Sequence, residues 1–553
     1  MSGYILLALI LVPLGTAALF LLIPSRFVLL VRALATLAAL AMFALAIWTF
    51  VAYQISKGGI QGDLRWDWIS NTGLLGDHGI TLHLGVDGIA ATLILLNGIA
   101  GLAATLVSLK IDYRPKDFFI LLFVLITGVY GTFVALDLFM FFFFYEVAVV
   151  PLYLLIVVWG SGPAPYGANK DKTYGAMKLT MMLVAASTGI FIGILAVFVK
   201  AGAGTFDLPT LWAHQFPIGF QKLFFPFLVI GCGVLGGLWP FHGWSPDGHA
   251  SAPTAVSMLH AGVLMKLGAF GIIRLGIQLL PEGAKFWMPG LMVLGTTAAL
   301  YGAFSATVQR DWKLFSGYSS VSHMGYVMMG LATLNPVGVN GAVLQMFSHG
   351  VMTALFFALI GAIYDQAHTR DIRAFSGLVR RMPKFVTLFV LAGFASLGLP
   401  GLSGFVAEFN IFVGSFKTFP LFGALGVFAA LITATYILRM FAFAFFGPFN
   451  PRWGSLRDLV PVEVVAGLAL AGAIVFMGVW PSPFVDRIAG GLKNIPAICP
   501  GGVCTATPLG GTSATRTGAQ NGGPSSRLLP AITVHAGETA RVLPHHAGVD
   551  AAV

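Results

Sequence analysis

Long apolar segments separated by short polar ones make up most of this chain. An α-helix needs about 20 consecutive apolar residues to cross the hydrocarbon core of a membrane. By this criterion the pattern predicts fourteen membrane-spanning helices. They are residues 4–23, 28–54, 84–109, 118–136, 138–159, 173–199, 223–243, 253–276, 287–307, 314–334, 341–363, 385–416, 420–446 and 461–481. The expected fold class is an all-α polytopic membrane protein.

Two of these spans are interrupted near the middle. The seventh span (223–243) reaches Pro240 and continues into a polar segment, and the twelfth (385–416) contains the sequence LGLPGLSG around Pro400. A break frees backbone groups that lipid cannot hydrogen-bond, so it is tolerated where protein or water surrounds it. Paired interruptions at corresponding places are typical of repeats that enclose an ion path. We therefore predict two inverted five-helix repeats with broken helices 7 and 12.

This pattern divides the chain into five parts. Residues 484–553 are rich in Gly, Ala, Ser, Thr and Pro, which predicts a flexible tail on the non-cytoplasmic side. In that tail Cys499 and Cys504 either close a small disulfide or remain two thiols. The other parts are 1–117 (helices 1–3 with an external loop), 118–276 (first repeat), 287–446 (second repeat) and 447–483 (last helix).

Composition and charge agree with a membrane protein. With 57% hydrophobic and 9% charged residues, a single large soluble core is excluded. The formal charge of +10 comes from Lys and Arg in short loops, mostly the odd-numbered ones. By the positive-inside rule these loops face the cytoplasm, which places both termini on the opposite side. Nucleic-acid binding is therefore a poor explanation of the charge. Arg274, Arg310 and Arg439 lie near span ends and are expected to be interface anchors.

Ionisable residues inside apolar spans are the candidate functional residues. Such groups are costly in a membrane and mark proton or ion paths. Together they predict a polar axis along which water chains pass protons. The candidates for proton translocation are Glu146, Lys178, His242, His260, Lys266, His323, His349 and Glu408.

Each candidate also has a structural alternative. Glu146 is then a neutral acid bonded to a backbone carbonyl, Lys266 a partner in a helix–helix ion pair, and Lys178 a side chain extended to the interface. Likewise, Glu408 is then a structural carboxyl group and each histidine a hydrogen-bonded core residue. No metal motif, phosphate loop, nucleophile elbow or cofactor fingerprint is present in the sequence. We expect no cofactor or metal in this chain, which by itself is not expected to be an enzyme.

Six stretches carry a family resemblance. They are GVDGIAATLILLN (from Gly85), FYEVAVVPLYLLIVVWG (Phe144), PFHGWSPDGHASAPTAVSMLHAGVLMKLGAFG (Pro240), YSSVSHMGYVMMGL (Tyr318), LQMFSHGVMTALFFALIGAIYDQAHTRDI (Leu344) and MPKFVTLFVLAGFASLGLPGLSGFVAEF (Met382). From about residue 80 to 480 the chain resembles the antiporter-like subunits of bacterial proton-pumping NADH–quinone oxidoreductase, respiratory complex I. The SHG, TRDI and LPGLSGFVAEF segments favour subunit M.

The resemblance implies proton translocation from the cytoplasm outward, driven by NADH oxidation and quinone reduction elsewhere in the complex. NADH, FMN, iron–sulfur clusters and ubiquinone are then expected in partner subunits, and the partners are other membrane-arm subunits in the bacterial inner membrane. Residue by residue, Glu146, Lys266, His323 and Glu408 match family positions.

One position departs from the family pattern. Where VKxPxxPxHxW has a lysine on helix 7, this chain has Leu235. The basic partner of Glu146 is therefore missing. Either protons move by a different route, or this copy is a non-pumping scaffold. The D-type component of a multisubunit cation/proton antiporter and a membrane hydrogenase subunit share the expected fold and remain alternatives.

Overall fold

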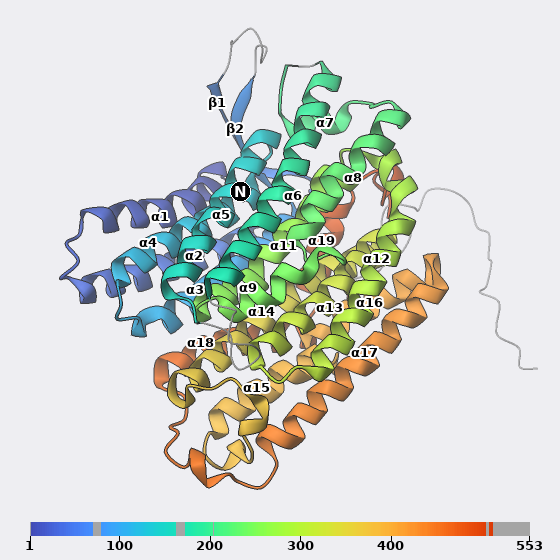
Figure 1. The fold of residues 1–553 in the computed structure, drawn as a ribbon. Coiled ribbons are helices and arrows are strands. Elements are labelled where there is room, and N and C mark those ends of the chain that lie inside the picture. The colour runs from blue at the N-terminus through green and yellow to red at the C-terminus, as the bar shows by residue number, and fades with distance from the viewer. Residues whose placement is uncertain (1, 70–78, 162–171, 203, 505–507, 512–553) are drawn as a thin grey trace, which may run out of the picture. The chain divides into compact units, whose positions relative to one another are not determined.

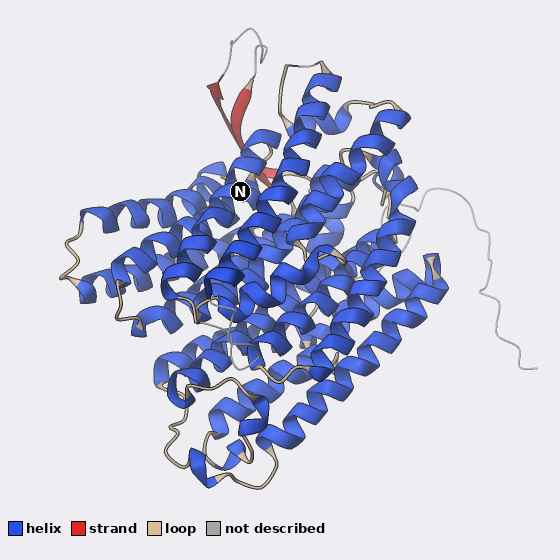
Figure 2. Cartoon of the chain, in the orientation of Figure 1, coloured by secondary structure: helices blue, strands red, loops and turns tan. Residues whose placement is uncertain are grey.

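The computed structural model describes residues 2–69, 79–161, 172–202, 204–504 and 508–511. Nearly all of this is helix (Figures 1 and 2). The α-helices are α1 (Gly3–Leu22), α2 (Val28–Ala52), α3 (Gly88–Val107), α4 (Pro115–Val134), α5 (Leu138–Trp159), α6 (Lys172–Ala201), α7 (Leu208–Ala213), α8 (Ile218–Leu235), α9 (Trp244–Ser251), α10 (Thr254–Leu259), α11 (Met265–Gly271), α12 (Pro281–Val308), α13 (Trp312–Ala332), α14 (Pro336–Ala367), α15 (Pro383–Ser396), α16 (Ser403–Thr418), α17 (Pro420–Met440), α18 (Pro461–Val479) and α19 (Ser482–Leu492). Short 3₁₀ segments are Ser108–Lys110, Phe241–Gly243, Ile372–Ala374, Leu378–Arg380, Pro451–Trp453 and Pro500–Gly502, and π-helical segments are His260–Leu264, Ile272–Ile277 and Phe441–Phe445.

The all-α membrane fold class is confirmed. Among the described residues, 12 helical segments are long and apolar enough to cross a membrane. The predicted spans 314–334 and 385–416 are helical as well, as α13 and as the pair α15 and α16. Fourteen spans and the inverted relation of the repeats stay predictions.

Both predicted interruptions are present. α8 ends at Leu235, and the chain turns through Gly237 (φ +77°) before the short helix α9. α15 ends at Ser396, and the chain passes Gly398 (φ +72°) and Gly401 (φ +93°) before α16 begins. Glycine adopts positive φ without the steric cost that a Cβ imposes, which explains why these breaks are glycine-rich. Each break leaves helix ends inside the bundle.

Three segments form the centre of the bundle. The most apolar windows of 254–277 and α14 are 100% buried, and that of 88–110 is 94% buried, against 33% for α1 and α18. Small residues let neighbouring helices approach closely. A Cβ added to Gly325 on α13 would lie 2.4 Å from the backbone nitrogen of Ala299 on α12. Side chains on the central segments are therefore held away from lipid on every side.

The external loop contains strands that the sequence pattern did not indicate. β1 (Gln61–Ile69) and β2 (Ile80–Val86) form an antiparallel hairpin in which Trp66 pairs with Leu82 (Figure 2). β1 is mostly exposed and alternates Trp with charged residues, so it has no apolar face long enough to signal a strand. Residues 70–78 lie outside the described residues.

The prediction of a flexible tail from residue 484 is wrong for its first part. α19 buries Phe484, Val485, Ile488 and Leu492, and the Phe484 ring lies 4.8 Å from that of Phe347 on α14. These apolar residues recur at helical spacing, but averaging the composition over the whole tail hides them. Residues 505–507 and 512–553 of the predicted tail lie outside the described residues.

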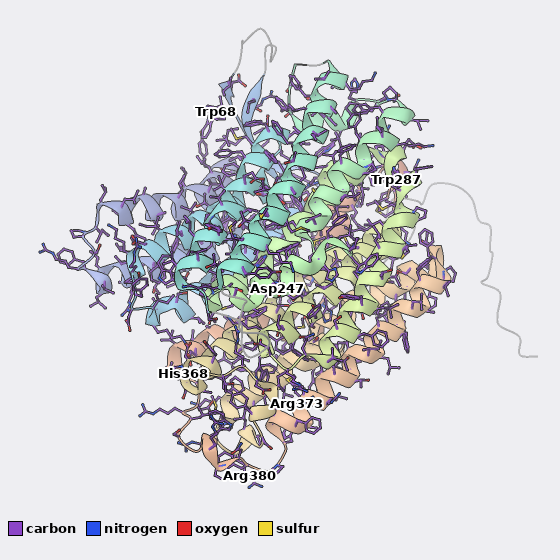
Figure 3. The ribbon with its side chains drawn as sticks, in the orientation of Figure 1. Trp68, Asp247, Trp287, His368, Arg373 and Arg380 are labelled. Carbon is purple, nitrogen blue, oxygen red and sulfur yellow. A yellow bond between two sulfur atoms is a disulfide. The ribbon has the colours of Figure 1, made fainter. Side chains whose placement is uncertain are left out.

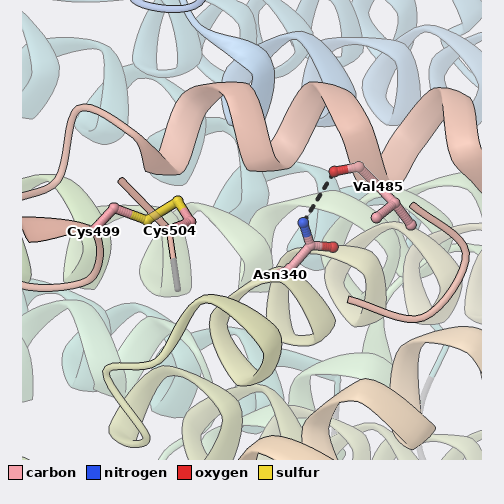
Figure 4. The surroundings of a disulfide bond; sticks show 4 residues. All are labelled: Asn340, Val485, Cys499 and Cys504. Atoms are coloured by element: carbon pink, nitrogen blue, oxygen red, sulfur yellow. Dashed lines mark hydrogen bonds between the residues drawn. A yellow bond between two sulfur atoms is a disulfide. The ribbon is translucent and has the colours of Figure 1, made fainter. Parts of the chain in front are cut away.

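Two further contacts fix α19 and the segment after it. The amide nitrogen of Asn340 on α14 donates a hydrogen bond to the Val485 carbonyl at 3.0 Å, and Cys499 and Cys504 form a disulfide (Figure 4). The sequence left open whether these cysteines are bonded or free, and in the structure they are bonded.

On the hairpin, His83 joins two carboxylates. Its Nδ1 lies 2.6 Å from Asp207 Oδ1 and its Nε2 lies 2.8 Å from Asp63 Oδ1. Arg65 lies 3.9 Å from Asp207. Burial lowers the pKa of His83, but hydrogen bonds and charge from Asp207 and Asp63 outweigh it, so the pKa is raised above its usual value. The imidazolium thus links β1 and β2 to the N-cap of α7.

We expect this hairpin to be more stable at acidic than at alkaline pH. A histidine with a raised folded-state pKa contributes stability that is fully present below its unfolded pKa and lost as pH rises through the folded value. His83→Gln should lower the local opening free energy by about 1–2 kcal/mol at pH 6 and by much less at pH 9. Hydrogen exchange of β2 amides, corrected for intrinsic pH dependence, measures this. His214→Gln is the control, because that ring contacts Phe216. If the β2 amides of the wild type are equally protected from exchange at pH 6 and pH 9 after this correction, the expectation is wrong.

Candidate functional site

Lys266 lies at the centre of the buried polar groups. It is 0% exposed, and its Nζ lies 2.8 Å from His349 Nδ1 on α14. The Nζ atom also donates to the carbonyl of Ala261 in the π-helical turn His260–Leu264. π-Helical turns occur frequently at functional sites, and they shift backbone carbonyls away from regular helix pairing. Among the described residues Lys266 forms no ion pair with a carboxylate, unlike its structural alternative.

From His349 the polar groups continue to the second break. The rings of His349 and His323 stack with centroids 5.3 Å apart. His323 Nδ1 lies 3.4 Å from Glu408 Oε1, and Gln345 Nε2 lies 3.1 Å from the same ring nitrogen. His323 Nε2 lies 3.0 Å from the hydroxyl of Ser396, the last residue of α15. All of these side chains are buried.

Glu408 lies against the break itself. A Cβ on Gly398 would lie 2.8 Å from Glu408 Oε2, so the glycine leaves room for the carboxyl group. Ser403, which begins α16, pairs with Ser348 of α14 through hydroxyls 2.7 Å apart. The broken helix therefore places Glu408 beside His323 and beside irregular backbone.

On the other side of Lys266 two histidines lie together. The rings of His249 and His260 have centroids 4.3 Å apart, and both residues are 0% exposed. Within the described part of the chain, none of their four ring nitrogens has a protein hydrogen-bond partner. Buried polar atoms are normally hydrogen-bonded, so such nitrogens are suited to bind internal water. His249 is an addition to the predicted residues, because it belongs to the polar segment after Pro240 and not to an apolar span.

Lys178 joins the first break to α6. Its Nζ lies 2.6 Å from Asp247 Oδ2 on α9, with the two side chains 32% and 20% exposed. Figure 3 places Asp247 in the middle of the view, among the helices. His242, in the same broken segment, has its ring 4.8 Å from that of Tyr301 on α12. The ammonium of Lys178 is thus held at the interruption by a carboxylate.

Glu146 is separate from these groups. It lies on α5 and interacts with the Ser187 hydroxyl of α6. Its Oε1 has no hydrogen-bond partner among the described residues, and no ion pair there includes it. Leu235, the residue at the family's lysine position, is fully buried at the end of α8. The structure therefore brings together Lys266, His349, His323 and Glu408, and pairs Lys178 with Asp247. It gives Glu146 no basic partner within the part of the chain that is described.

Two basic residues near the ends of predicted spans, Lys313 and Arg370, are buried. Lys313 Nζ donates to the Ala252 carbonyl and Arg370 donates to the Ala250 carbonyl, each at 2.5 Å. Arg370 also forms an ion pair with Asp311 at 3.0 Å, with both side chains 1% exposed. The C-terminal end of a helix carries free carbonyls and partial negative charge, which cations stabilise. These residues fix the end of α9 inside the protein. A signal was available in the sequence, because Asp371 directly follows Arg370 and Asp311 lies two residues before Lys313.

Arg274 is a further correction. It was expected to be an interface anchor but is 4% exposed and forms an ion pair with Asp87 at 2.7 Å. Asp87 is the N-cap of α3. The arginine therefore fixes a central helix instead of anchoring the bundle in the membrane surface.

Comparison with known proteins agrees with this architecture. The family profile described as NADH:quinone oxidoreductase/Mrp antiporter, TM, matches residues 135–433. The chain is 36% identical over 450 residues to NAD(P)H-quinone oxidoreductase chain 4 2 of Microcystis aeruginosa, covering 80% of this chain and 79% of that protein. It is 37% identical to chain 4-3 of Nostoc sp., covering 80% and 78%.

Solved structures show the same fold. A chain of respiratory complex I from Thermus thermophilus with bound NADH superposes with a TM-score of 0.80 at 27% identity, covering 89% of this chain and 99% of that one. A chain of the Mrp complex from Dietzia sp. has a TM-score of 0.77 at 18% identity, covering 89% and 97%, which shows the fold alone.

We expect Asp311→Asn to destabilise the protein strongly. The asparagine can still accept from the α13 amides that Asp311 caps, but Arg370 loses its buried counter-charge. Removing one partner of a buried ion pair costs about 3–5 kcal/mol. Thermal unfolding of the purified complex measures the loss. Asp117→Asn is the matched control, because its pair with Arg114 is exposed. Equal unfolding temperatures for the two variants would show that the pair does not hold α9.

Proposed function

This chain belongs to the NADH:quinone oxidoreductase and Mrp antiporter transmembrane family, and we propose that it acts as a subunit M, or chain 4, of a complex I-type membrane arm. It is a membrane-arm proton-translocating subunit, and its partners are other membrane-arm subunits. The single observation that carries the proposed route is the buried series Lys266, His349, His323 and Glu408, which runs from the centre of the bundle to the second break.

The first step that we propose is exchange between Lys266 and His349. A charged ammonium donates to His349 Nδ1, which must then be the unprotonated nitrogen of a neutral ring. His349 Nε2 has no protein partner within the described residues. A water at this nitrogen lets a proton leave towards His323 while Nδ1 accepts one from Lys266. The ring thereby passes on a proton without staying protonated on both nitrogens.

The second step is delivery to Glu408. His323 lies beside the Glu408 carboxyl group. The side-chain amide of Gln345 lies within hydrogen-bond distance of both groups and holds them next to each other. Opposite charges within 4 Å attract strongly in a low-dielectric interior, so a proton arriving at His323 favours an ionised Glu408. Transfer to Glu408 neutralises both groups. The adjacent break offers irregular backbone and water access, through which we propose that the proton leaves outward.

Proton uptake in our proposal uses the two histidines on the other side of Lys266. His249 and His260 have unpaired nitrogens suited to a water chain, and Lys313 and Arg370 fix the helix end beside His249. Lys178 and Asp247 supply an opposite-charge pair at the first break. We propose that this pair takes the part that a lysine at position 235 would otherwise play.

The alternatives differ in what they require. A scaffold copy has no need for a buried lysine beside a neutral histidine, because an unpaired ammonium in a membrane core costs stability. Retention of that arrangement supports a translocase. An Mrp-type antiporter subunit shares the fold, and the partners that co-purify with the chain separate the two assignments. We further propose that NADH, FMN, iron–sulfur clusters and quinone are bound in partner subunits, that the membrane is the bacterial inner membrane, and that both termini lie on the non-cytoplasmic side.

We expect Lys266→Met to impair pumping. A positioned proton donor contributes about 10²-fold or more to the step it serves, and a thioether has no proton to give. Either the ratio of protons to electron pairs falls or coupled oxidation slows to that extent. Inverted membrane vesicles with matched complex content measure both quantities. Lys285→Met is the control, because Lys285 pairs with Glu282 on an exposed turn. An unchanged ratio and rate in a fully assembled complex would support the scaffold alternative.

We also expect Lys178 and Asp247 to act as one unit. Lys178→Met and Asp247→Asn should each lower proton pumping several-fold, and the double variant should be no worse than the poorer single variant, because residues in one ion pair are non-additive. Lys285→Met with Glu282→Gln gives the matched comparison for an exposed pair. Independent, additive losses at Lys178 and Asp247 would disprove the unit.

A further inference from the structure

A cavity of about 690 Å³ lies between α12, α17 and the segment that follows α14, and Tyr436 of α17 forms part of its wall. The wall also includes Arg310 and Arg373, whose loops the positive-inside pattern assigns to the cytoplasmic side. Figure 3 places Arg373 towards the end of the view opposite Trp68 of the external hairpin. By this assignment the cavity brings Tyr436 within reach of water on the cytoplasmic side.

Hydroxyl groups connect Tyr436 with the buried proton series. Tyr436 Oη lies 2.9 Å from Ser319 Oγ on α13, and it also interacts with the hydroxyl of Ser396, the last residue of α15. Ser396 Oγ in turn lies 3.0 Å from His323 Nε2. The Phe315 ring packs edge-on against Tyr436 with ring centres 5.2 Å apart, which fixes the phenol in place. A hydroxyl both donates and accepts hydrogen bonds, so this series can pass a proton although no ion enters it.

The ring of His323 presents its two nitrogens to different partners. Nε2 faces Ser396, whereas Nδ1 lies 3.4 Å from Glu408 Oε1 and 3.1 Å from Gln345 Nε2. An imidazole can take up a proton at one nitrogen and release another from the second. Gln345 suits either tautomer, because its side-chain carbonyl has no partner among the described residues and a turn of the amide presents it to an Nδ1–H. His323 therefore lies between the hydroxyl series and the carboxyl group at the second break.

We propose that Tyr436 and Ser396 form a second proton inlet, which leads from the cytoplasmic cavity to His323. The inlet adds to the proposed route through His323 and Glu408 and depends on it. A hydronium ion in the cavity gives a proton to the Tyr436 hydroxyl, which passes its own proton to Ser396, and Ser396 passes its own to Nε2 of a ring that carries hydrogen on Nδ1. Water and both hydroxyls are restored, and the ring is positively charged until its Nδ1 proton moves to the Glu408 carboxylate.

The charges of the cavity wall bear on which cation uses the inlet. Arg310, Arg373 and Arg439 repel metal cations from the cavity. They also lower the concentration of hydronium there, which the carboxylate of Asp371, beside the backbone of Arg373, partly offsets. A proton crosses the hydroxyl contacts by exchange of hydrogen bonds, whereas a sodium ion would have to lose its water and displace the buried hydroxyls. The inlet therefore admits protons and excludes sodium.

The test uses the whole complex in inverted membrane vesicles at matched complex content. A positioned proton donor contributes about 10²-fold to the step it serves, and water entering the vacated space recovers part of this. Tyr436→Phe and Ser396→Ala should therefore each lower the ratio of protons to electron pairs or slow coupled oxidation about tenfold. Because both hydroxyls belong to one series, the double variant should be no worse than the poorer single variant. Thr435→Val is the control on the same helix, because the Thr435 hydroxyl is exposed to the outside and bonds the Leu431 carbonyl.

Two variants of nearly equal shape separate the hydroxyl from packing. Ser396→Thr keeps the hydroxyl and should pump close to the wild-type ratio, whereas Ser396→Val should show the loss. Equal pumping by these two variants would overturn the inlet, as would wild-type pumping by Tyr436→Phe or independent, multiplying losses in the double variant. This pair also decides the matter if Ser396→Ala or Tyr436→Phe fails to assemble.

Lys266→Met tells failure of the inlet from failure of the proposed route. If Lys266→Met impairs pumping and Tyr436→Phe does not, the inlet is wrong and the route stands. If neither variant changes pumping, both are wrong. Impairment by both, with rescue by threonine at position 396, supports both.

Discussion

The need to bury a lysine side chain in the centre of a membrane bundle governs this structure. Charge in such a place is costly unless hydrogen bonds replace its water, and Lys266 obtains these from His349 and from the Ala261 carbonyl. The carbonyl is available because the helix widens into a π-helical turn just before the lysine. The segments around it are the most completely buried of the chain. The π-helical turn and the close packing of the neighbouring helices therefore both act to accommodate Lys266.

The two broken helices solve related problems in different ways. At the first break, the end of α9 is fixed by the buried cations Lys313 and Arg370, which take up carbonyls that no helix continues to use. At the second, glycines with positive φ let the chain turn close to Glu408. The end of α9 is thus held by cations beside the pair of Lys178 and Asp247, whereas the second break presents the carboxyl group of Glu408. The proposed transfer runs towards that carboxyl group.

The buried glutamates of the two halves, Glu146 and Glu408, differ in how many polar side chains they contact. Glu408 lies within reach of a histidine and an amide, whereas Glu146 contacts a serine and stands apart from the buried series. A leucine at position 235 keeps the end of α8 apolar. The pair of Lys178 and Asp247 then supplies opposite charges at the first break. With leucine at position 235, the Lys178–Asp247 pair is the opposite-charge pair that we propose acts at that break.

The sequence by itself determined the membrane class, the places of the two breaks and which ionisable residues lie inside apolar segments. These follow from hydropathy, proline and glycine, which act locally along the chain. It did not indicate the external strands, because β1 buries no apolar face, or α19, whose few apolar residues are diluted in a polar tail. Only the tertiary structure decided which ionisable groups meet. Lys313 and Arg370 have the sequence pattern of loop residues, yet they are buried because the end of α9, far away in the chain, needs cations there. Partners of this kind depend on how distant helices pack, and no spacing within one segment encodes that.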